Sequence, residues 1–317
     1  MIENKPIFYV GGLFLARKSS FKNKYFIIFL IISSIFVVYW HYSNSKEDIF
    51  KASEDYKACV HFVDVGQGDC EIICCEDSVV LIDAGEVDKG KDVVRYLKKL
   101  NKNKIDLIVA THPHTDHFGG LIDVINRFDV SKIVMPEISL KLTPTNIIYK
   151  KFLNKIKEKK IVVEKAKKGE SLNIGGGVIK ILAPCRKNYE KLNDFSIGLL
   201  FCYKDISFLF CGDMEKSSEK DLLDSGQKIR ADVFKLNHHG SSTSNTKKFL
   251  EAVKPKYCVI EVGAFNSYGH PSKNVLNLLS KLGVKKTFRT DKNGTIVFLT
   301  DGKHLSFKTE KEGDKIS

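Results

Sequence analysis

The sequence predicts an α/β fold in which two β-sheets stack face to face and helices cover both outer sides, a four-layer α/β/β/α sandwich. From Ala58 onward, short apolar runs alternate with amphipathic helical stretches, and no Pro/Gly/Ser-rich linker interrupts them. A single doubly wound sheet is the alternative, but it leads us to expect a glycine-rich phosphate loop after the first strand, and residues 64–69 (DVGQGD) are not such a fingerprint. The length of 317 residues suits one domain of roughly 250 residues plus a targeting segment.

The apolar periodicity assigns each element in turn. Strands are expected at residues 59–65, 71–75, 78–84, 104–110, 132–135, 160–166, 177–183, 197–204, 206–212, 232–237, 257–263 and 294–300. Apolar residues at helical spacing, such as Val93, Val94, Leu97 and Leu100, predict helices. The expected helices are Gly90–Leu100, Leu121–Arg127, Asn146–Lys159, Glu215–Leu223, Thr246–Val253 and Ser272–Leu282.

The N-terminal region predicts a transmembrane anchor at residues 25–42. Its apolar run, at about 16 to 18 residues, is near the lower limit for a span, and aromatic residues close it. Cations in residues 1–24 favour a cytoplasmic N-terminus and an extracytoplasmic folded domain in a single-pass protein of the cell membrane. A buried core helix and a cleaved signal segment are the alternatives. The predicted parts are a basic N-terminus (1–24), the anchor (25–42), a linker (43–57), the folded domain (58–309) and a polar tail (310–317).

Charge and cysteine usage give weaker indications. The formal net charge of +13 permits a polyanionic partner such as nucleic acid, a cell-wall polymer or anionic lipid, although a lysine-rich solvated surface explains the same value. The chain has 8 cysteines but no Cys-x-x-Cys spacing, so buried free thiols are favoured over a structural zinc site or a disulfide framework.

The most informative segment is Thr111–His117 (THPHTDH), which follows an apolar strand. His112 and His114 project to the same side of an extended backbone and can share one metal ion. Asp116 and His117 follow the turn and can reach a second ion. A dinuclear hydrolase needs two ions about 3.5 to 4 Å apart, a bridging carboxylate and a bridging water that ionises near neutral pH.

Two later strand ends supply the remaining candidates. Asp213 ends the strand at 206–212 and could bridge the ions, whereas a helix N-cap is its simpler interpretation. His238 and His239 are adjacent on an extended segment, so they point in opposite directions and have different roles. We expect His239 to be a ligand and His238 a proton-handling group, and the reverse order stays open. Ser241 could face the substrate, and His270 could be a general acid or a phosphate contact.

The first ion lacks a third imidazole, because no histidine lies between His117 and His238. Asn193 or Asp194 could supply an oxygen ligand instead. Such a ligand set shifts the preference toward Mn²⁺, with Zn²⁺ as the alternative. Asp64, Asp69 and Asp83 lie at strand ends and are expected to orient the histidines or to form turns.

Taken together, these residues resemble the metallo-β-lactamase superfamily, and within it the hydrolase domain of the ComEC-type DNA-internalisation (competence) family. The matching stretches cover nearly all of residues 58–300: VDVGQGD (63–69), LIDAG (81–85), THPHTDHFGG (111–120), NDFSIGLLF (193–201), LFCGDM (209–214), FKLNHHGS (234–241), YGHP (268–271) and RTDKNGTI (289–296). The resemblance implies a four-layer sandwich, two metal ions and a phosphodiesterase or nuclease activity on DNA. It carries the metal-ligand role to His112, His114, Asp116, His117, Asp213 and one histidine of the 238–239 pair.

Full-length members of that family also carry a polytopic channel, so DNA transport by this chain alone is not expected. The expected partners are DNA, the membrane through the N-terminal helix, and other competence or cell-envelope proteins. Asp116, His238 and His270 are the expected catalytic residues. Two alternative functions stay open. One is a phosphodiesterase for a small-molecule or cell-wall substrate such as phosphorylcholine or teichoic acid, and the other is a non-catalytic DNA-binding accessory protein.

Overall fold

The computed structural model describes residues 20–311, except for the side chains of residues 20–24 and 38–48. The chain divides into two compact units, Met1–Asn44 and Ser45–Ser317. One helix, α1 (Ser20–Glu54), contains the segment that the sequence predicts as an anchor and most of the predicted linker. The predicted basic N-terminus and polar tail lie almost wholly outside the described residues.

The structure does not support the transmembrane anchor predicted at residues 25–42. Within the described part of the chain, no helix combines the length and the apolar character that a membrane span requires. The side chains of residues 38–42, at the end of the predicted anchor, are outside the described set.

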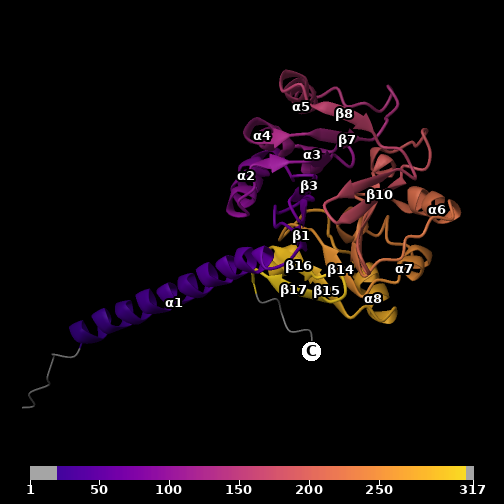
Figure 1. The fold of residues 1–317 in the computed structure, drawn as a ribbon. Coiled ribbons are helices and arrows are strands. Elements are labelled where there is room, and N and C mark those ends of the chain that lie inside the picture. The colour runs from indigo at the N-terminus through magenta and orange to yellow at the C-terminus, as the bar shows by residue number, and fades with distance from the viewer. Residues whose placement is uncertain (1–19, 312–317) are drawn as a thin grey trace, which may run out of the picture. The chain divides into compact units, whose positions relative to one another are not determined.

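The second unit is built on two sheets (Figure 1). The first sheet has the strand order β17–β16–β1–β2–β3–β5–β7–β8. Its strands are β1 (Ala58–Phe62), β2 (Glu71–Cys75), β3 (Ser78–Ile82), β5 (Leu107–Val109), β7 (Lys132–Met135), β8 (Val162–Lys165), β16 (Ile296–Thr300) and β17 (Leu305–Thr309). β4 (Lys104–Ile105) and β6 (Asp129–Val130) form a separate short pair.

The second sheet has the order β15–β14–β13–β12–β11–β10–β9. Its strands are β9 (Ser171–Ile174), β10 (Gly177–Ala183), β11 (Gly198–Tyr203), β12 (Ile206–Phe210), β13 (Val233–Lys235), β14 (Tyr257–Ile260) and β15 (Lys286–Arg289). In both sheets one half is antiparallel and the other half is parallel. Because parallel strands end at the same edge, the loops after β3, β5, β12, β13 and β14 can converge on one site.

Helices cover both outer faces. The longer ones are α2 (Gly90–Lys99), α4 (Leu121–Arg127) and α5 (Ile147–Glu158) on the first sheet, and α6 (Lys216–Asp224), α7 (Lys247–Val253) and α8 (Lys273–Lys281) on the second. The short ones are η1 (Val87–Lys89), α3 (Thr115–Phe118), η2 (Leu192–Phe195), η3 (Asn237–Gly240) and α9 (Thr290–Asn293). The α/β fold and its four-layer arrangement are therefore confirmed.

The core between the sheets is aromatic and fully buried. Phe62 and Phe298 of the first sheet contact Phe210 and Phe208 of the second, with ring centroids 5.9 and 6.0 Å apart respectively. Such large side chains bury much apolar surface and hold the sheets at a fixed spacing. That rigid sandwich fixes the strand ends from which the site is built.

Candidate metal centre

The first ligand group combines two imidazoles and a carboxylate. His112 and His114 follow β5, as the sequence predicts, and their Nε2 and Nδ1 atoms lie 3.1 Å apart. Asp213 follows β12, and its Oδ2 lies 3.8 Å from His112 Nε2. One ligand atom of each of these three side chains lies within 4.8 Å of the others. The structure therefore brings together the residues that the sequence assigned to the first ion.

The second ligand group contains Asp116, His117, His239 and again Asp213, with their ligand atoms within 4.8 Å of one another. His117 Nε2 lies 3.4 Å from Asp213 Oδ2. His239 Nε2 lies 3.4 Å from Asp116 Oδ2 and 3.7 Å from Asp213 Oδ1. Asp213 thus belongs to both groups, which is the position that a bridging carboxylate requires.

Three buried atoms of these groups lack hydrogen-bond partners among the described residues: His117 Nε2, His239 Nε2 and Asp213 Oδ1. A buried polar atom without a partner costs free energy, so its place in the fold needs a reason. Two imidazole nitrogens and a carboxylate oxygen that face one another form a donor set suited to divalent cations. The residues therefore fit the metal ions that the sequence predicts.

The electrostatics of the centre also favour cations. Burial lowers the pKa of His239, but the carboxylates of Asp213 and Asp69 outweigh burial and raise that pKa to about 10. Conversely, burial raises the pKa of Asp213, but the neighbouring imidazoles of His117 and His239 outweigh it and hold the pKa well below its usual range. Positive charge is stabilised at this point of the protein, as a metal site requires.

Hydrogen bonds fix the orientation of two ligand candidates. His117 Nδ1 donates to Asp83 Oδ2 at 2.7 Å, and Asp83 also accepts from the backbone and hydroxyl of Thr111. His239 Nδ1 donates to the carbonyl oxygen of Glu261 at 2.8 Å. In both rings Nδ1 is engaged, so Nε2 is the nitrogen that would bind an ion, releasing its proton on binding. Asp83 is thus one of the orienting groups that the sequence predicts.

Backbone geometry places Asp213. Gly212 has a φ of +51°, and a Cβ there would lie 2.9 Å from Thr111 Oγ1 and 3.1 Å from Ser196 Oγ. Only glycine satisfies both conditions without strain. The backbone N–H of Asp213 donates to Ser196 Oγ at 3.1 Å. Ser196 was not identified from the sequence, because a serine before an apolar strand carries no metal-site signal.

Lys235 is a functional candidate that the sequence pattern did not indicate. It is fully buried and forms an ion pair with Asp69, which lies 3.2 Å from His239 Nδ1. Burial raises the pKa of Asp69, but Lys235, His117 and His239 together outweigh burial and hold the pKa at about 2. The one indication in the sequence was that this lysine lies between apolar residues of a short strand. If such a strand is central in a sheet, the lysine is buried and is then paired with an opposite charge.

Two carboxyl groups, Glu71 and Glu261, are buried beside Asp69 and were also missed. Burial, followed by the Asp69 charge, raises the pKa of Glu261 to about 8. Glu261 Oε1 accepts from the backbone N–H of Cys70 at 3.2 Å. These groups lie behind the ligand candidates, where they support Asp69 and His239 and have no contact with solvent.

The predicted proton-handling residues lie at the mouth of the centre. His238 Nε2 is 3.7 Å from Asp213 Oδ2, and its Nδ1 is 3.1 Å from Thr243 Oγ1. The ring of His270 is 5.5 Å from that of His238. Ser241, the predicted substrate contact, is only 3 % exposed, and its hydroxyl lies 3.0 Å from Thr243 Oγ1. The structure thus gives Ser241 a role in shaping the turn that carries His238.

Three of the predicted oxygen donors lie outside the two ligand groups. Asp194 accepts from the backbone and hydroxyl of Ser218 at the start of α6, and Asn193 Nδ2 donates to Glu215. Asp64 Oδ1 accepts from the backbone N–H of Gly66, so it forms a turn. Among the described residues, the carboxylate that lies within 4.8 Å of the ligand atoms of His112 and His114 is that of Asp213, and not that of Asp194.

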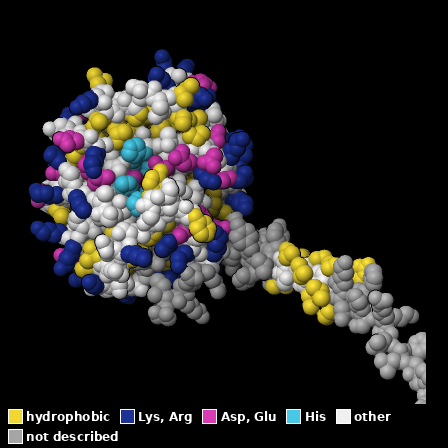
Figure 2. Space-filling model, turned by 180° about the vertical axis from the view of Figure 1, so that it is seen from behind, with side chains coloured by type: hydrophobic (Ala, Val, Ile, Leu, Met, Phe, Trp, Pro, Cys, Tyr) yellow, Lys and Arg dark blue, Asp and Glu magenta, His cyan; other side chains and the backbone are white. Residues whose placement is uncertain are grey.

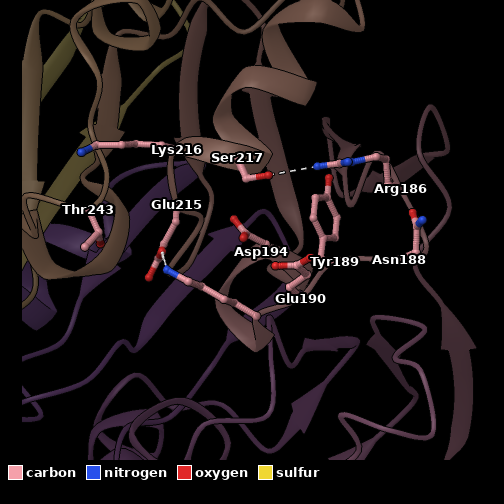
Figure 3. A pocket seen from close by; sticks show the side chains of 10 residues that line it. Arg186, Asn188, Tyr189, Glu190, Asp194, Glu215, Lys216, Ser217 and Thr243 are labelled. Atoms are coloured by element: carbon pink, nitrogen blue, oxygen red, sulfur yellow. Dashed lines mark hydrogen bonds and ion pairs between the residues drawn. The ribbon is translucent and has the colours of Figure 1, made fainter.

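The centre opens onto one face of the protein. Figure 2 shows histidine side chains gathered there, with acidic side chains beside them and Lys and Arg side chains around them. A cavity of about 570 Å³ adjoins the centre (Figure 3). It is lined by Arg186, Asn188, Tyr189, Glu190, Lys191, Asp194, Glu215, Lys216, Ser217 and Thr243. Thr243 also contacts His238, so the cavity and the centre share a wall.

Comparisons with known proteins agree with this geometry. The family model described as the metallo-beta-lactamase superfamily matches residues 63–260. ComE operon protein 3 of Bacillus subtilis (strain 168) is 28% identical over 257 residues, which are 75% of this chain and 32% of that protein. Competence protein ComA of Neisseria gonorrhoeae is 28% identical over 251 residues, 78% of this chain and 33% of that protein. The chain thus spans about a third of the length of these relatives.

Solved structures share the fold. The diiron beta-hydroxylase CmlA from Streptomyces venezuelae superposes with a TM-score of 0.53 at 13% identity, covering 77% of this chain and 54% of that chain. Igni18, a metallo hydrolase from Ignicoccus hospitalis, gives a TM-score of 0.51 at 15% identity, covering 77% of this chain and all of that one. At this level of identity the likeness concerns the architecture alone.

Proposed function

The chain belongs to the metallo-beta-lactamase superfamily and is related to competence proteins, and on that basis we propose that it hydrolyses phosphodiester bonds in DNA. The observation that carries the proposal is the membership of Asp213 in two ligand groups. His112 and His114 would hold one divalent ion with Asp213, and Asp116, His117 and His239 would hold the second with Asp213. Divalent ions bound there, Mn²⁺ or Zn²⁺, would supply Lewis-acid activation of water and of the phosphodiester.

Proton transfer is assigned to the mouth of the centre. His238 is partly exposed, and Thr243 orients its ring through Nδ1, so Nε2 faces the space in front of Asp213. We assign to His238 the protonation of the leaving oxygen. Burial and the imidazoles of His238 and His239 lower the pKa of His270 to about 4, so its ring is neutral at pH 7. A neutral imidazole can donate one N–H to a phosphate oxygen, which is the role proposed for His270.

Exposed aromatic rings in the loop that carries His270 support a single-stranded nucleic-acid substrate. Phe265 is fully exposed, and Tyr268 is largely exposed and stacks on His270 with ring centroids 5.8 Å apart and planes 18° apart. Exposed aromatic rings of this kind stack on the bases of single strands without sequence preference, at about 1 to 3 kcal/mol per base. A strand whose phosphate enters the centre could place its bases against these rings.

The cavity beside the centre favours a second candidate, a phosphodiesterase for a zwitterionic cell-wall or lipid headgroup. Its walls carry both signs of charge: Arg186, Lys191 and Lys216 are cationic, and Glu190 and Glu215 are anionic. A phosphorylcholine-like group presents both charges at once and would be matched by such a wall. DNA would use only the cations. Attachment to competence or cell-envelope proteins stays a prediction.

The test uses the full chain, stripped of metal and then supplied with Mn²⁺ or Zn²⁺. We expect metal-dependent cleavage of single-stranded DNA that is abolished in Asp213→Asn and retained in Asp224→Asn, a matched change at an exposed carboxylate. Hydrolysis of bis-p-nitrophenyl phosphate without cleavage of DNA would favour the second candidate, a phosphodiesterase for a cell-wall or lipid headgroup. No hydrolysis of either compound by metal-loaded protein would refute both.

A further inference from the structure

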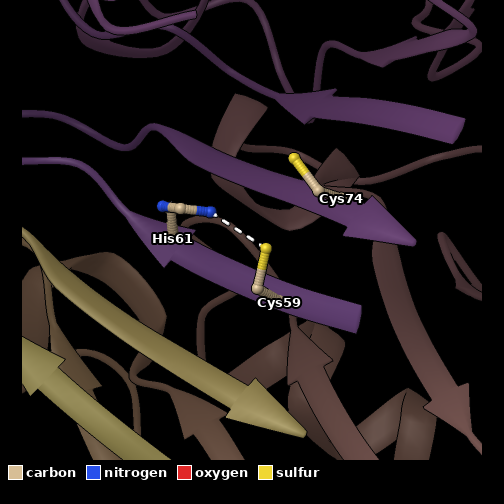
Figure 4. A group of neighbouring side chains, drawn as sticks. All are labelled: Cys59, His61 and Cys74. Carbon is tan, nitrogen blue, oxygen red and sulfur yellow. Dashed lines mark hydrogen bonds between the residues drawn. The ribbon is translucent and has the colours of Figure 1, made fainter. Parts of the chain in front are cut away.

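A second cluster of metal-ligand side chains lies on the outer face of the first sheet, between adjacent strands. Cys59 and His61 are two residues apart on β1 and therefore point to the same face. Cys74 on β2 is the direct cross-strand partner of Cys59. Figure 4 shows Cys59 and His61 on one strand, joined by their contact, and Cys74 on the neighbouring strand. None of them belongs to the ligand groups of the metal centre.

The three ligand atoms are close to one another and fixed in orientation. His61 Nε2 lies 3.2 Å from Cys59 Sγ, and all three ligand atoms lie within 4.8 Å of one another. His61 Nδ1 lies 2.9 Å from the hydroxyl oxygen of Tyr96 on α2. With Nδ1–H donating to Tyr96, the lone pair of Nε2 faces the two sulfurs, as in a histidine that ligates a metal.

We propose that Cys59, His61 and Cys74 form a zinc-binding site that supplies three of the four ligands of a tetrahedral ion. Thiolate and imidazole are the donors that zinc prefers, and they discriminate against Mn²⁺ and Mg²⁺. Typical zinc bonds of about 2.3 Å to sulfur and about 2.0 Å to nitrogen place tetrahedral S and N ligands about 3.5 Å apart. The Sγ–Nε2 separation of 3.2 Å needs a change of only a few tenths of an ångström.

Charge balance also favours a divalent ion. The side chains are buried, with exposed fractions of 0 % for His61, 1 % for Cys59 and 7 % for Cys74. Two thiolates and a neutral imidazole carry two negative charges, which one Zn²⁺ cancels, and the two thiol protons leave to solvent when the ion binds. A neutral assembly avoids the penalty of burying net charge. The hydrogen bond with Cys59 lowers the pKa of the Cys74 thiol, whereas the same bond and burial raise the pKa of the Cys59 thiol, so the ion has to displace the Cys59 proton.

The site would tie together three elements. Tyr96 belongs to α2, and its ring packs on Phe50 near the end of α1, with centroids 5.0 Å apart. Zinc there would cross-link β1 to β2 and hold α2 through the bond between His61 and Tyr96. The sequence did not show this site, because its cysteines are joined by strand register and not by a short spacing.

The test is cobalt substitution of the full-length, reduced protein. Thiolate ligands give Co²⁺ a near-ultraviolet charge-transfer band, and the ligand candidates of the metal centre contain no thiol. We expect the band in the wild type and in Asp213→Asn, and its loss in Cys59→Ser and Cys74→Ser. Cys75→Ala is the matched control, since this thiol lies next to Cys74 but packs in the core between the sheets; it should keep the band.

The wild-type measurement keeps the proposal falsifiable even where a cysteine variant fails to fold. A reduced, folded wild type that shows no band at saturating Co²⁺ would overturn the proposal. Protein purified without reductant could instead contain no zinc, have a mass lower by two hydrogens, and have Cys59 and Cys74 resistant to thiol alkylation. That result would show a cross-strand disulfide and overturn the zinc site. Neither result would affect the proposed phosphodiesterase, whose ligands are separate.

Discussion

The buried ion pair between Lys235 and Asp69 allows a quantitative test of how the metal centre is supported. Lys235 is fully buried, and within the described residues it contacts Asp69 and, at 3.4 Å, the carbonyl oxygen of Gly212. Lys235→Met keeps most of the volume but removes the lysine cation that pairs with the Asp69 carboxylate. Removing one partner of a buried pair costs about 3 to 5 kcal/mol.

That free-energy cost predicts a change in Tm and a change in metal affinity. For a domain of this size, about 2 to 4 °C of Tm is lost per kcal/mol, so Lys235→Met should lower the Tm by roughly 6 to 20 °C. Without Lys235, the pKa of Asp69 rises, which weakens the ion pair between Asp69 Oδ1 and His239 Nδ1 that lie 3.2 Å apart. Loss of such support typically weakens metal binding by about 10- to 100-fold.

The assay is thermal unfolding of metal-stripped protein, followed by metal titration of the folded variant. Lys220→Met is the matched control, because its side chain is exposed and the Tm should move little. The double variant Lys235→Met/Asp69→Asn should recover much of the lost stability, since it buries no unpaired charge. An unchanged Tm in Lys235→Met, or a double variant no more stable than the single one, would refute the assigned ion pair.

Three further predictions concern other parts of the centre. Asp83→Asn should weaken metal binding by about 10- to 100-fold, because the carboxylate holds His117 Nδ1, and titration of the stripped protein with Mn²⁺ measures this; wild-type affinity would contradict the assignment. Burial raises the pKa of Glu261 from 4.5 to about 8, so the folded state keeps a proton that the unfolded state has lost between these values. The free energy of unfolding should therefore fall as the pH rises across that window, by up to about 1.4 kcal/mol per pH unit. Urea unfolding of the metal-stripped protein at several pH values measures this dependence, which should be weaker in Glu261→Gln. The same dependence in wild type and variant would contradict the raised pKa of Glu261. Gly68→Ala should destabilise the protein by more than about 1 kcal/mol, because φ is +132° and the added Cβ would lie 2.2 Å from the Asp116 carbonyl oxygen; a wild-type Tm would show that the loop can move.

Elements with a strong local pattern could be predicted from the sequence. The helix α2 was expected because Val93 and Leu97 repeat at helical spacing, and both are buried in the structure. The strand β17 was missed because its side chains alternate between exposed and partly buried positions, which gives no apolar run. β9 and β15 were missed for a related reason, since each has polar residues at its exposed positions.

The same distinction explains which residues of the metal centre could be predicted from the sequence. Its histidines could be predicted because they are adjacent in sequence or follow clear strands. Lys235 and Glu261 could not, since a charged residue is normally exposed and only the tertiary fold shows that these two are buried beside Asp69. Cys59 and Cys74 come together through strand pairing, which a single sequence does not reveal.

The central claim is that Asp213 is shared by two adjacent metal ions, and the most direct test is electron paramagnetic resonance of the full chain loaded with Mn²⁺. Manganese suits the oxygen and imidazole ligands of the centre and avoids thiolates, so it does not report on the cysteine cluster. We expect two bound Mn²⁺ per chain with a spin-coupled spectrum that is lost in Asp213→Asn. Binding of a single ion, or two ions without coupling, would contradict it.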